Sequence, residues 1–213
     1  MIACTLCHTP AAPFAQVGDR EYFRCPRCQL TLEHPDRLPS AEEEKGQYDL
    51  HDNRPDDPGY RRFLSQLADP LMERLAAGAR GLDFGCGPGP ALAALLTENG
   101  FPCETYDPIY APDRSPLAQH YDFVTCTEVI EHLHQPAREW QWFADHVKPG
   151  GWLGIMTRWL VDDAAFANWH YRRDPTHVCF WQPETFQWLA RQQGWQVVLA
   201  ENPVVLMQKR PQH

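Results

Sequence analysis

The chain has 213 residues, which is enough for one domain of ordinary size with a small additional module. Its formal net charge is −9, so it lacks the diffuse positive charge that attracts phosphate backbones and anionic lipids, and nucleic acid is disfavoured as a partner. The N-terminus has no basic start followed by an apolar run, and no stretch reaches the length needed to span a bilayer. We therefore expect a cytoplasmic protein without membrane contact.

Four of the eight cysteines lie in the first segment, residues 1–34, as two CxxC pairs. Cys4 and Cys7 are separated from Cys25 and Cys28 by seventeen residues, a spacing typical of zinc ribbons. A redox dithiol or buried free cysteines are the alternatives. Zinc held by four thiolates has no open coordination position, so we predict a structural zinc knuckle. The metal would supply the stability of a segment with little apolar material.

Beyond this segment, residues 35–58 are rich in Pro, Asp and Glu, which predicts a solvated and irregular linker. In the domain expected over residues 59–213, apolar residues at helical spacing and then Asp69-Pro70 predict two short consecutive helices. The elements expected next are a strand at 81–84, a helix at 90–99, strands at 101–106 and 121–126, a helix at 136–147, a strand at 152–156, a helix at 183–193 and a hairpin of strands at 195–200 and 204–208. This alternation predicts an α/β fold with a doubly wound, mostly parallel sheet and a C-terminal antiparallel hairpin.

The stretch LDFGCGPG, residues 82–89, runs from an expected strand into an expected helix. Glycines at such a place let the backbone turn sharply and approach a ligand that a Cβ atom would exclude. Asp107 ends the next expected strand, at the distance typical of a carboxylate that accepts from both hydroxyls of a ribose. Pro90 removes an amide that would hold a pyrophosphate at the helix start, which argues against a dinucleotide reductase.

Four motifs in succession, LDFGCGPG, ETYDP, YDFVTCTEVIEHL and VKPGGWL, resemble those of class I S-adenosylmethionine-dependent methyltransferases, over roughly residues 60 to 208. The resemblance implies a Rossmann-like fold that binds S-adenosyl-L-methionine. It implies that the methionine portion lies against the glycine loop and Asp83, the ribose at Asp107, and the donor methyl near Glu128. A cap or turn acceptor is the alternative for Asp83. The cofactor-binding residues implied in this way are Asp83, Gly85, Cys86, Gly87, Gly89, Asp107 and Glu128.

The chain departs from the family's pattern after Asp107. The usual pattern has a further strand before the YDFV strand, and its end contacts adenine. Here only residues 108–120 fill the interval, and they include three prolines. We therefore expect this edge strand to be truncated or absent, which leaves the adenine contacts unassigned.

The acceptor side of this fold usually lies after the fourth and fifth strands and in N-terminal additions. Here those places contain Glu131-His132 and the stretch WHYRRDPTHVCFW, which ends at Trp181. Many class I methyltransferases of small molecules look similar, with an aromatic cap over the donor methyl, and ordinary core is the alternative. His177 is a candidate general base, with a structural histidine as the alternative. We expect His132 to be structural.

These features favour transfer of a methyl group from S-adenosylmethionine to a small-molecule acceptor, at oxygen or carbon, by in-line displacement. One alternative is an RNA methyltransferase that binds nucleic acid through the zinc ribbon, although acidic neighbours accompany the three arginines there. The other is a non-catalytic S-adenosylmethionine-binding protein that uses the knuckle for a protein partner. The intact glycines and Asp107 argue against a decayed cofactor site.

Overall fold

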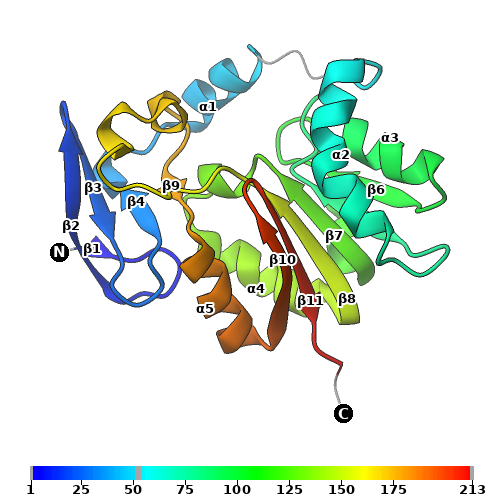
Figure 1. Ribbon diagram of the computed structural model, residues 1–213. Coiled ribbons are helices and arrows are strands. Elements are labelled where there is room, and N and C mark those ends of the chain that lie inside the picture. Colours follow the sequence, from blue (N-terminus) through cyan, green and yellow to red (C-terminus); the bar gives the residue numbers. More distant parts are fainter. Residues whose placement is uncertain (1, 51–53, 212–213) are drawn as a thin grey trace.

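The computed structural model describes residues 2–50 and 54–211 and contains two sheets, one in each half of the molecule (Figure 1). The larger sheet has six strands in the order β10-β11-β8-β7-β5-β6. Its middle strands pair in parallel, and β11 and β10 add an antiparallel hairpin at one edge, as predicted. Its strands are β5 (Gly81–Phe84), β6 (Cys103–Tyr106), β7 (Tyr121–Thr127), β8 (Val147–Met156), β10 (Trp195–Glu201) and β11 (Val204–Lys209).

Helices cover both faces of this sheet, which makes it doubly wound. Successive residues of β7 point to opposite faces: Phe123 packs with α2 and α3, and Val124 packs with α4 and α5. No helix in the described ranges has the length and apolar character needed to cross a bilayer. The covering helices are α2 (Pro58–Met72), α3 (Ala91–Glu98), α4 (Pro136–His146) and α5 (Pro183–Gln193).

The prediction of two short helices around Asp69-Pro70 is wrong, because α2 continues through Pro70 as one helix. Proline removes one helical hydrogen bond, which normally ends or kinks a helix. Here Leu64, Leu67 and Leu71 are all buried on one face, so their packing against the sheet holds both sides of the proline in one helix.

The edge strand expected to be missing after Asp107 is absent from the described part of the chain. Residues 108–120 form a loop that contains only a short 3₁₀ helix, η2, and β6 is therefore the edge of the sheet. The other connections contain 3₁₀ turns as well. These 3₁₀ helices are η1 (Pro35–Arg37), η2 (Ser115–Ala118), η3 (Ile130–His132), η4 (Phe166–Asn168) and η5 (His170–Arg173).

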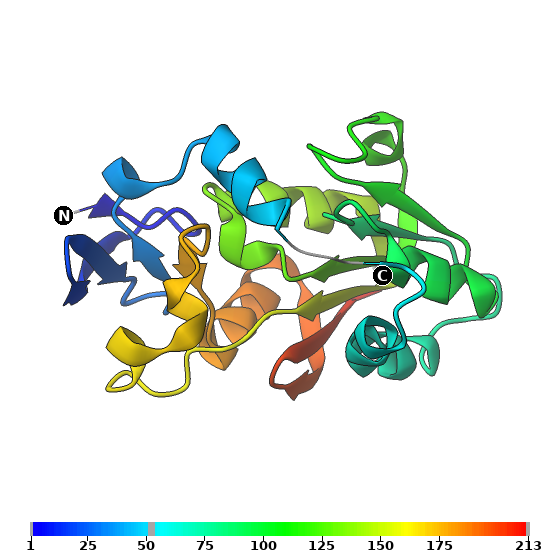
Figure 2. The ribbon, with the colours of Figure 1, turned by 90° about the horizontal axis from the view of Figure 1, so that it is seen from above.

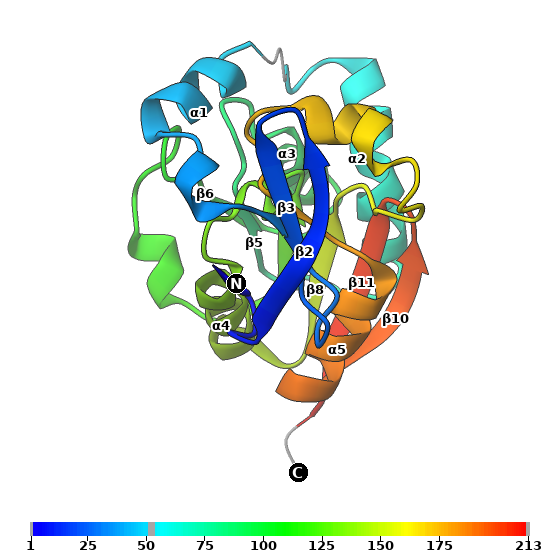
Figure 3. The same cartoon turned by 90° about the vertical axis from the view of Figure 1, so that its left-hand side faces the viewer.

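The smaller sheet is antiparallel and combines the N-terminal segment with a strand from far along the sequence. Its order is β1-β2-β3-β4-β9, and β9 is the strand that pairs with β4. Figure 3 shows β2 and β3 of this sheet side by side in front of the larger domain. Apolar side chains of the N-terminal segment such as Leu6 and Leu30 belong to the same core cluster as Trp140 of α4 and Leu189 of α5. The predicted module of residues 1–34 is thus packed on the larger domain. The five strands are β1 (Ile2–Ala3), β2 (Pro10–Val17), β3 (Arg20–Arg24), β4 (Thr31–Glu33) and β9 (Cys179–Phe180).

The irregular backbone predicted for residues 35–58 is wrong in part, because α1 (Ala41–Tyr48) lies within this range. A capping box begins the helix: the Ser40 hydroxyl accepts from the Glu43 amide at 3.3 Å, and the Glu43 carboxylate accepts from the Ser40 amide at 2.8 Å. No residue of α1 is buried, which agrees with its polar composition. Composition indicated exposure correctly, but it did not indicate irregular backbone.

The centre of the larger sheet supplies a test of its packing. A Cβ atom on Gly81 in β5 would lie 2.0 Å from the ring of Phe123, which is fully buried in the neighbouring strand β7. We expect Gly81→Ala to lower the free energy of unfolding by about 1 to 3 kcal/mol, as overpacking of a core does. Urea denaturation followed by circular dichroism measures this change.

Gly46→Ala is the matched control, because Gly46 lies in α1, where an added Cβ would meet no atom within 4 Å. It should leave stability unchanged or raise it slightly, since alanine favours helix. Equal stability of Gly81→Ala and the unmodified protein would contradict the close packing of Phe123 on β5.

Candidate functional site

A cavity of about 720 Å³ lies at the carboxyl ends of β5, β6 and β7. Open α/β sheets bind their ligands at this edge, and the volume lies within the range of small-molecule pockets. Its wall comes from the loops that follow these three strands, from α1 and from the loop between η5 and β9. Segments that are far apart in the sequence, from Glu44 to His177, therefore meet at one site.

The glycine loop after β5 forms one side of the cavity. Gly85 and Gly87 have φ angles of +77° and +64°, a left-handed conformation that favours glycine. A Cβ on Gly85 would lie 2.4 Å from Val129, whereas one on Gly87 would meet no atom within 4 Å. Gly85 is thus required by packing, and Gly87 presents bare backbone to the cavity. Cys86 also lines the cavity, whereas Gly89 does not.

Asp107 ties the glycine loop to the loop after β6. Its carboxylate accepts from the amide of Gly87 at 3.0 Å and from the amides of Ile109 and Tyr110 at 2.8 and 3.0 Å. The side chain lines the cavity although it is largely buried. An ionised carboxylate offers about four acceptor positions. Three are used here, so Asp107 can accept directly from one further hydroxyl, while acceptance from two would require release of an amide.

Asp83 lies beneath the glycine loop, where it faces a small space next to the main cavity. It is buried, and its carboxylate accepts from the Thr125 hydroxyl at 2.8 Å. Burial raises the pKa of Asp83 to about 6, although hydrogen bonds from Thr125 and the Ala93 amide oppose the rise. The hydrogen bond from Thr125 joins β5 to the neighbouring strand β7 beneath the glycine loop.

Glu128 lies directly after β7 and lines the cavity. Its φ angle is +51°, an uncommon conformation for a residue other than glycine, and its amide donates to the carbonyl of Met156 at 2.7 Å. Burial raises the pKa of Glu128 to about 7. The Tyr171 hydroxyl lies 3.3 Å from this carboxylate. The structure thus holds a carboxyl group at the place where the sequence predicted one.

Two histidines meet edge to face in the wall of the cavity. The rings of His132 and His177 lie 4.7 Å apart, and both residues line the wall. His132 was expected to be structural, and the structure places it at the cavity. The predicted aromatic cap is mostly core: Trp181 is fully buried against Phe186, and Trp169 packs on Phe180.

The contribution of α1 to the cavity was not predicted from the sequence. Glu44 and Tyr48 of this helix line the wall. The Glu44 carboxylate lies 2.9 Å from His134, and the Tyr48 ring meets the His132 ring edge-on at 5.1 Å. The capping-box sequence at Ser40 was the signal that could have revealed this helix.

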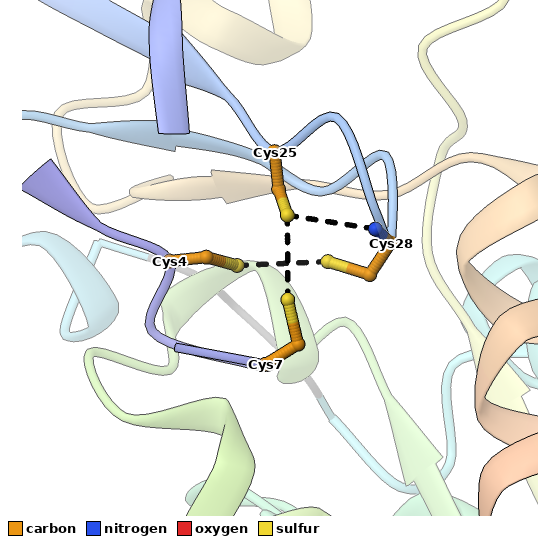
Figure 4. Close-up of side chains that lie close together, drawn as sticks. All are labelled: Cys4, Cys7, Cys25 and Cys28. Carbon is orange, nitrogen blue, oxygen red and sulfur yellow. Dashed lines mark hydrogen bonds between the residues drawn. The ribbon is translucent and has the colours of Figure 1, made fainter. Parts of the chain in front are cut away.

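The four cysteines of the N-terminal segment converge on one point (Figure 4). The sulfurs of Cys4 and Cys28 are 3.5 Å apart and those of Cys7 and Cys25 are 3.3 Å apart, too far for disulfides, which need about 2.05 Å. Tetrahedral bonds of about 2.3 Å to zinc would place sulfurs about 3.8 Å apart, close to this arrangement. The donor set therefore fits zinc. None of the four cysteines lines the cavity, which suits a structural metal.

The two halves of the knuckle have the same backbone turn. His8 donates its amide to the Cys4 carbonyl at 2.9 Å, and Gln29 donates to the Cys25 carbonyl at 3.0 Å. Both of these residues have positive φ angles, +60° and +63°. Such paired turns aim the thiols of each CxxC sequence at a shared centre, so the spacing in the sequence predicted the geometry correctly.

Comparisons with known proteins concern the larger domain and its cavity. A family model described as a methyltransferase domain matches residues 58–200. The ubiquinone biosynthesis O-methyltransferase of Shewanella pealeana is 34% identical over 86 residues, which cover 40% of this chain and 36% of that protein. The chain thus matches about a third of the length of such curated relatives.

Two solved structures from Burkholderia thailandensis share the fold. One is 1,6-didemethyltoxoflavin-N1-methyltransferase with bound 1,6-didemethyltoxoflavin and S-adenosylhomocysteine, with a TM-score of 0.57 and 16% identity over 94% of this chain and 100% of that chain. The other is an O-methyltransferase family protein, with a TM-score of 0.53 and 18% identity over 82% of this chain and 65% of that chain. At these identities the similarity shows the fold alone.

Zinc binding by the four cysteines can be tested by substitution. Because four thiolates close a tetrahedral site, Cys25→Ser should lower the zinc content by one ion per chain. Elemental analysis of protein purified without chelator measures this loss. Cys103→Ser, outside the knuckle, is the control and should retain the metal. Absence of zinc from the unmodified protein would show that the cysteines serve another purpose.

Proposed function

The chain belongs to a methyltransferase family, and from this premise we propose that it transfers the methyl group of S-adenosyl-L-methionine to a small-molecule acceptor, at oxygen or carbon. The observation that carries the proposal is the composition of the cavity described above. Its one end has the glycine loop and Asp107, and its other end has Glu128, His132 and His177. In this proposal the donor and the acceptor share one cavity.

The residues at the first end fit the donor. The bare backbone at Gly87 leaves room for a ligand, and Asp107 has one acceptor position for a ribose hydroxyl. Acidic side chains outnumber basic ones along the wall, which suits a positively charged sulfonium. When bound, S-adenosylmethionine supplies an electrophilic methyl group. We propose that Gly85, Cys86 and Gly87 hold its methionine portion and Asp107 its ribose.

At the second end, His177 can take a proton from the acceptor. Its Nδ1 lies 2.6 Å from the carbonyl oxygen of Tyr171. A carbonyl only accepts, so Nδ1 carries the proton and Nε2 carries the lone pair. A base with this tautomer, held at the wall of the cavity, suits an in-line displacement in which the main task is to position the reactants.

Two observations favour a small-molecule acceptor over RNA. The name of a curated relative refers to the biosynthesis of ubiquinone, and the name of a solved structure with the same fold refers to 1,6-didemethyltoxoflavin. Both ubiquinone and 1,6-didemethyltoxoflavin are small molecules. The arginines of the N-terminal sheet that an RNA would need are engaged elsewhere, because Arg20 pairs with Glu33 and Arg24 with Asp163, each at 2.6 Å. These pairs leave little positive charge for a phosphate track.

Donor binding supplies the first test. Titration calorimetry should show that the protein binds S-adenosylmethionine and that Asp107→Ala weakens binding about tenfold or more, because a hydrogen bond to a charged group contributes about 1.5 to 3 kcal/mol. Asp113→Ala is the control in the same loop, since Asp113 bonds only to Ser115 in the described contacts. No binding by the unmodified protein would refute the proposed donor. Unchanged affinity in Asp107→Ala would refute the ribose assignment.

His177 supplies the second test. His177→Ala should lower turnover by about 10² to 10⁴ and leave donor binding nearly unchanged. Turnover is measured as S-adenosylhomocysteine released with a panel of phenols and catechols. His120→Ala, at an exposed position outside the cavity, is the control. If His177 is only structural, the substitution will lower the melting temperature while the folded protein retains turnover within a few fold.

A further inference from the structure

We propose that the acceptor end of the cavity is a divalent metal site, separate from the cysteine knuckle, formed by Glu131, His132 and His177 with Glu128 beside them. One ligand atom from each of the first three residues lies within 4.8 Å of the others. Two imidazoles and a carboxylate around one point are a donor set typical of transition-metal sites in proteins.

Both histidines have the tautomer that a metal ligand requires. Nδ1 of His132 lies 3.0 Å from the carbonyl of Thr176, and Nδ1 of His177 lies 2.6 Å from the carbonyl of Tyr171. In each ring the proton is therefore on Nδ1, and the lone pair is on Nε2. Metal-binding histidines almost always donate the other ring N–H to a carbonyl or carboxylate in this way.

Glu131 is a buried carboxyl group that has hydrogen bonds but no cation beside it. It is fully buried, and no salt bridge joins it to a Lys or Arg within the described residues. The Thr157 hydroxyl donates to one of its oxygens at 3.0 Å, and the Tyr171 hydroxyl donates to the other. These contacts orient the carboxylate as partners of metal ligands do.

The second carboxyl group increases the need for positive charge. Glu128 and Glu131 both face the hydroxyl of Tyr171, which has a single proton to donate. Two carboxylates that share a buried site require either a proton or a cation, and a divalent ion would neutralise both.

The backbone keeps these side chains together. Glu131 and His132 are adjacent in η3, and the amide of Val178 donates to the carbonyl of Glu131 at 2.9 Å. This bond places His177 next to η3 although the two segments are far apart in sequence. The ligand positions thus depend on main-chain contacts rather than on flexible side chains alone.

The donor set indicates which ions would bind and what they would do. Mixed imidazole and carboxylate ligands suit Mn²⁺, Fe²⁺, Co²⁺ or Zn²⁺ better than Ca²⁺, which takes oxygen ligands. Glu128, His132 and His177 line the cavity, so an ion held there would meet an acceptor oxygen. His177 would then be a ligand rather than the base, and the ion would lower the pKa of the acceptor hydroxyl, whose proton leaves to solvent. This role rests on the proposed function, whereas the site itself does not.

The test measures Mn²⁺ binding without donor or acceptor. Protein that retains its knuckle zinc, as checked by elemental analysis, is freed of loosely held metal with a weak chelator and titrated with Mn²⁺, and the free ion is followed by its paramagnetic resonance signal. We expect one Mn²⁺ per chain. Glu131→Gln and His132→Gln should each weaken Mn²⁺ binding at least tenfold. Loss of a residue that only hydrogen-bonds to a metal ligand already weakens metal binding by about tenfold or more, and these two residues are ligands themselves. Glu139→Gln, in the same cavity but outside the cluster, is the control and should bind as the unmodified protein does.

Absence of Mn²⁺ binding, or equal binding by the unmodified protein and both variants, would overturn the inference. His132→Gln alters a half-buried side chain and keeps the test decisive if Glu131→Gln fails to fold. Calorimetry with S-adenosylmethionine on the same samples separates the two proposals. Donor binding without Mn²⁺ binding would refute the metal site alone, and Mn²⁺ binding without donor binding would refute the methyl donor alone.

Discussion

Two hydrogen bonds at one residue join the two halves of the molecule. The carbonyl of Val178 accepts from the amide of Glu33 in β4, and its amide donates to the carbonyl of Glu131 in η3, both at 2.9 Å. The guanidinium of Arg20, paired with Glu33, also donates to the carbonyl of Pro175 at 3.2 Å. The N-terminal sheet therefore holds the segment that brings Asp174 and His177 to the cavity wall, and Figure 2 shows this segment between the two sheets. Stability of the cysteine knuckle and geometry of the cavity are thus linked.

Features governed by local constraints could be predicted from the sequence. The glycine loop and the paired cysteine turns each need particular backbone angles or atoms, and these requirements are visible in a few adjacent residues. The prolines after Asp107 likewise predicted the missing edge strand. Features set by long-range packing could not be predicted in this way. Pairing of β9 with β4 and the continuity of α2 through Pro70 depend on surfaces that only the folded chain brings together.

The candidate site likewise contains residues that local sequence predicted and residues that only tertiary contacts bring together. Asp107 was identified because it ends a strand that leads to the cavity, and Glu128 was identified because the resemblance to the methyltransferase family implies a role for it; both line the cavity. Glu131 and His132 were noticed in the sequence, but their convergence with His177 depends on a tertiary contact between η3 and the later loop. Asp83 shows the reverse case, since a motif position expected to face the ligand is buried next to the main cavity and bonds to Thr125 of the neighbouring strand.

The exposure of helix α1 affects how small molecules enter and leave the cavity. It has no buried residue and is held by polar or edge-on contacts, among them Glu44 with His134 and Asp49 with the Tyr110 hydroxyl at 2.6 Å. Segments with so little buried apolar surface open at a far lower free-energy cost than the strands of a core, and their amides exchange with solvent hydrogen first. Fluctuation of this one helix can therefore admit and release small molecules on a fast timescale while the sheet remains intact.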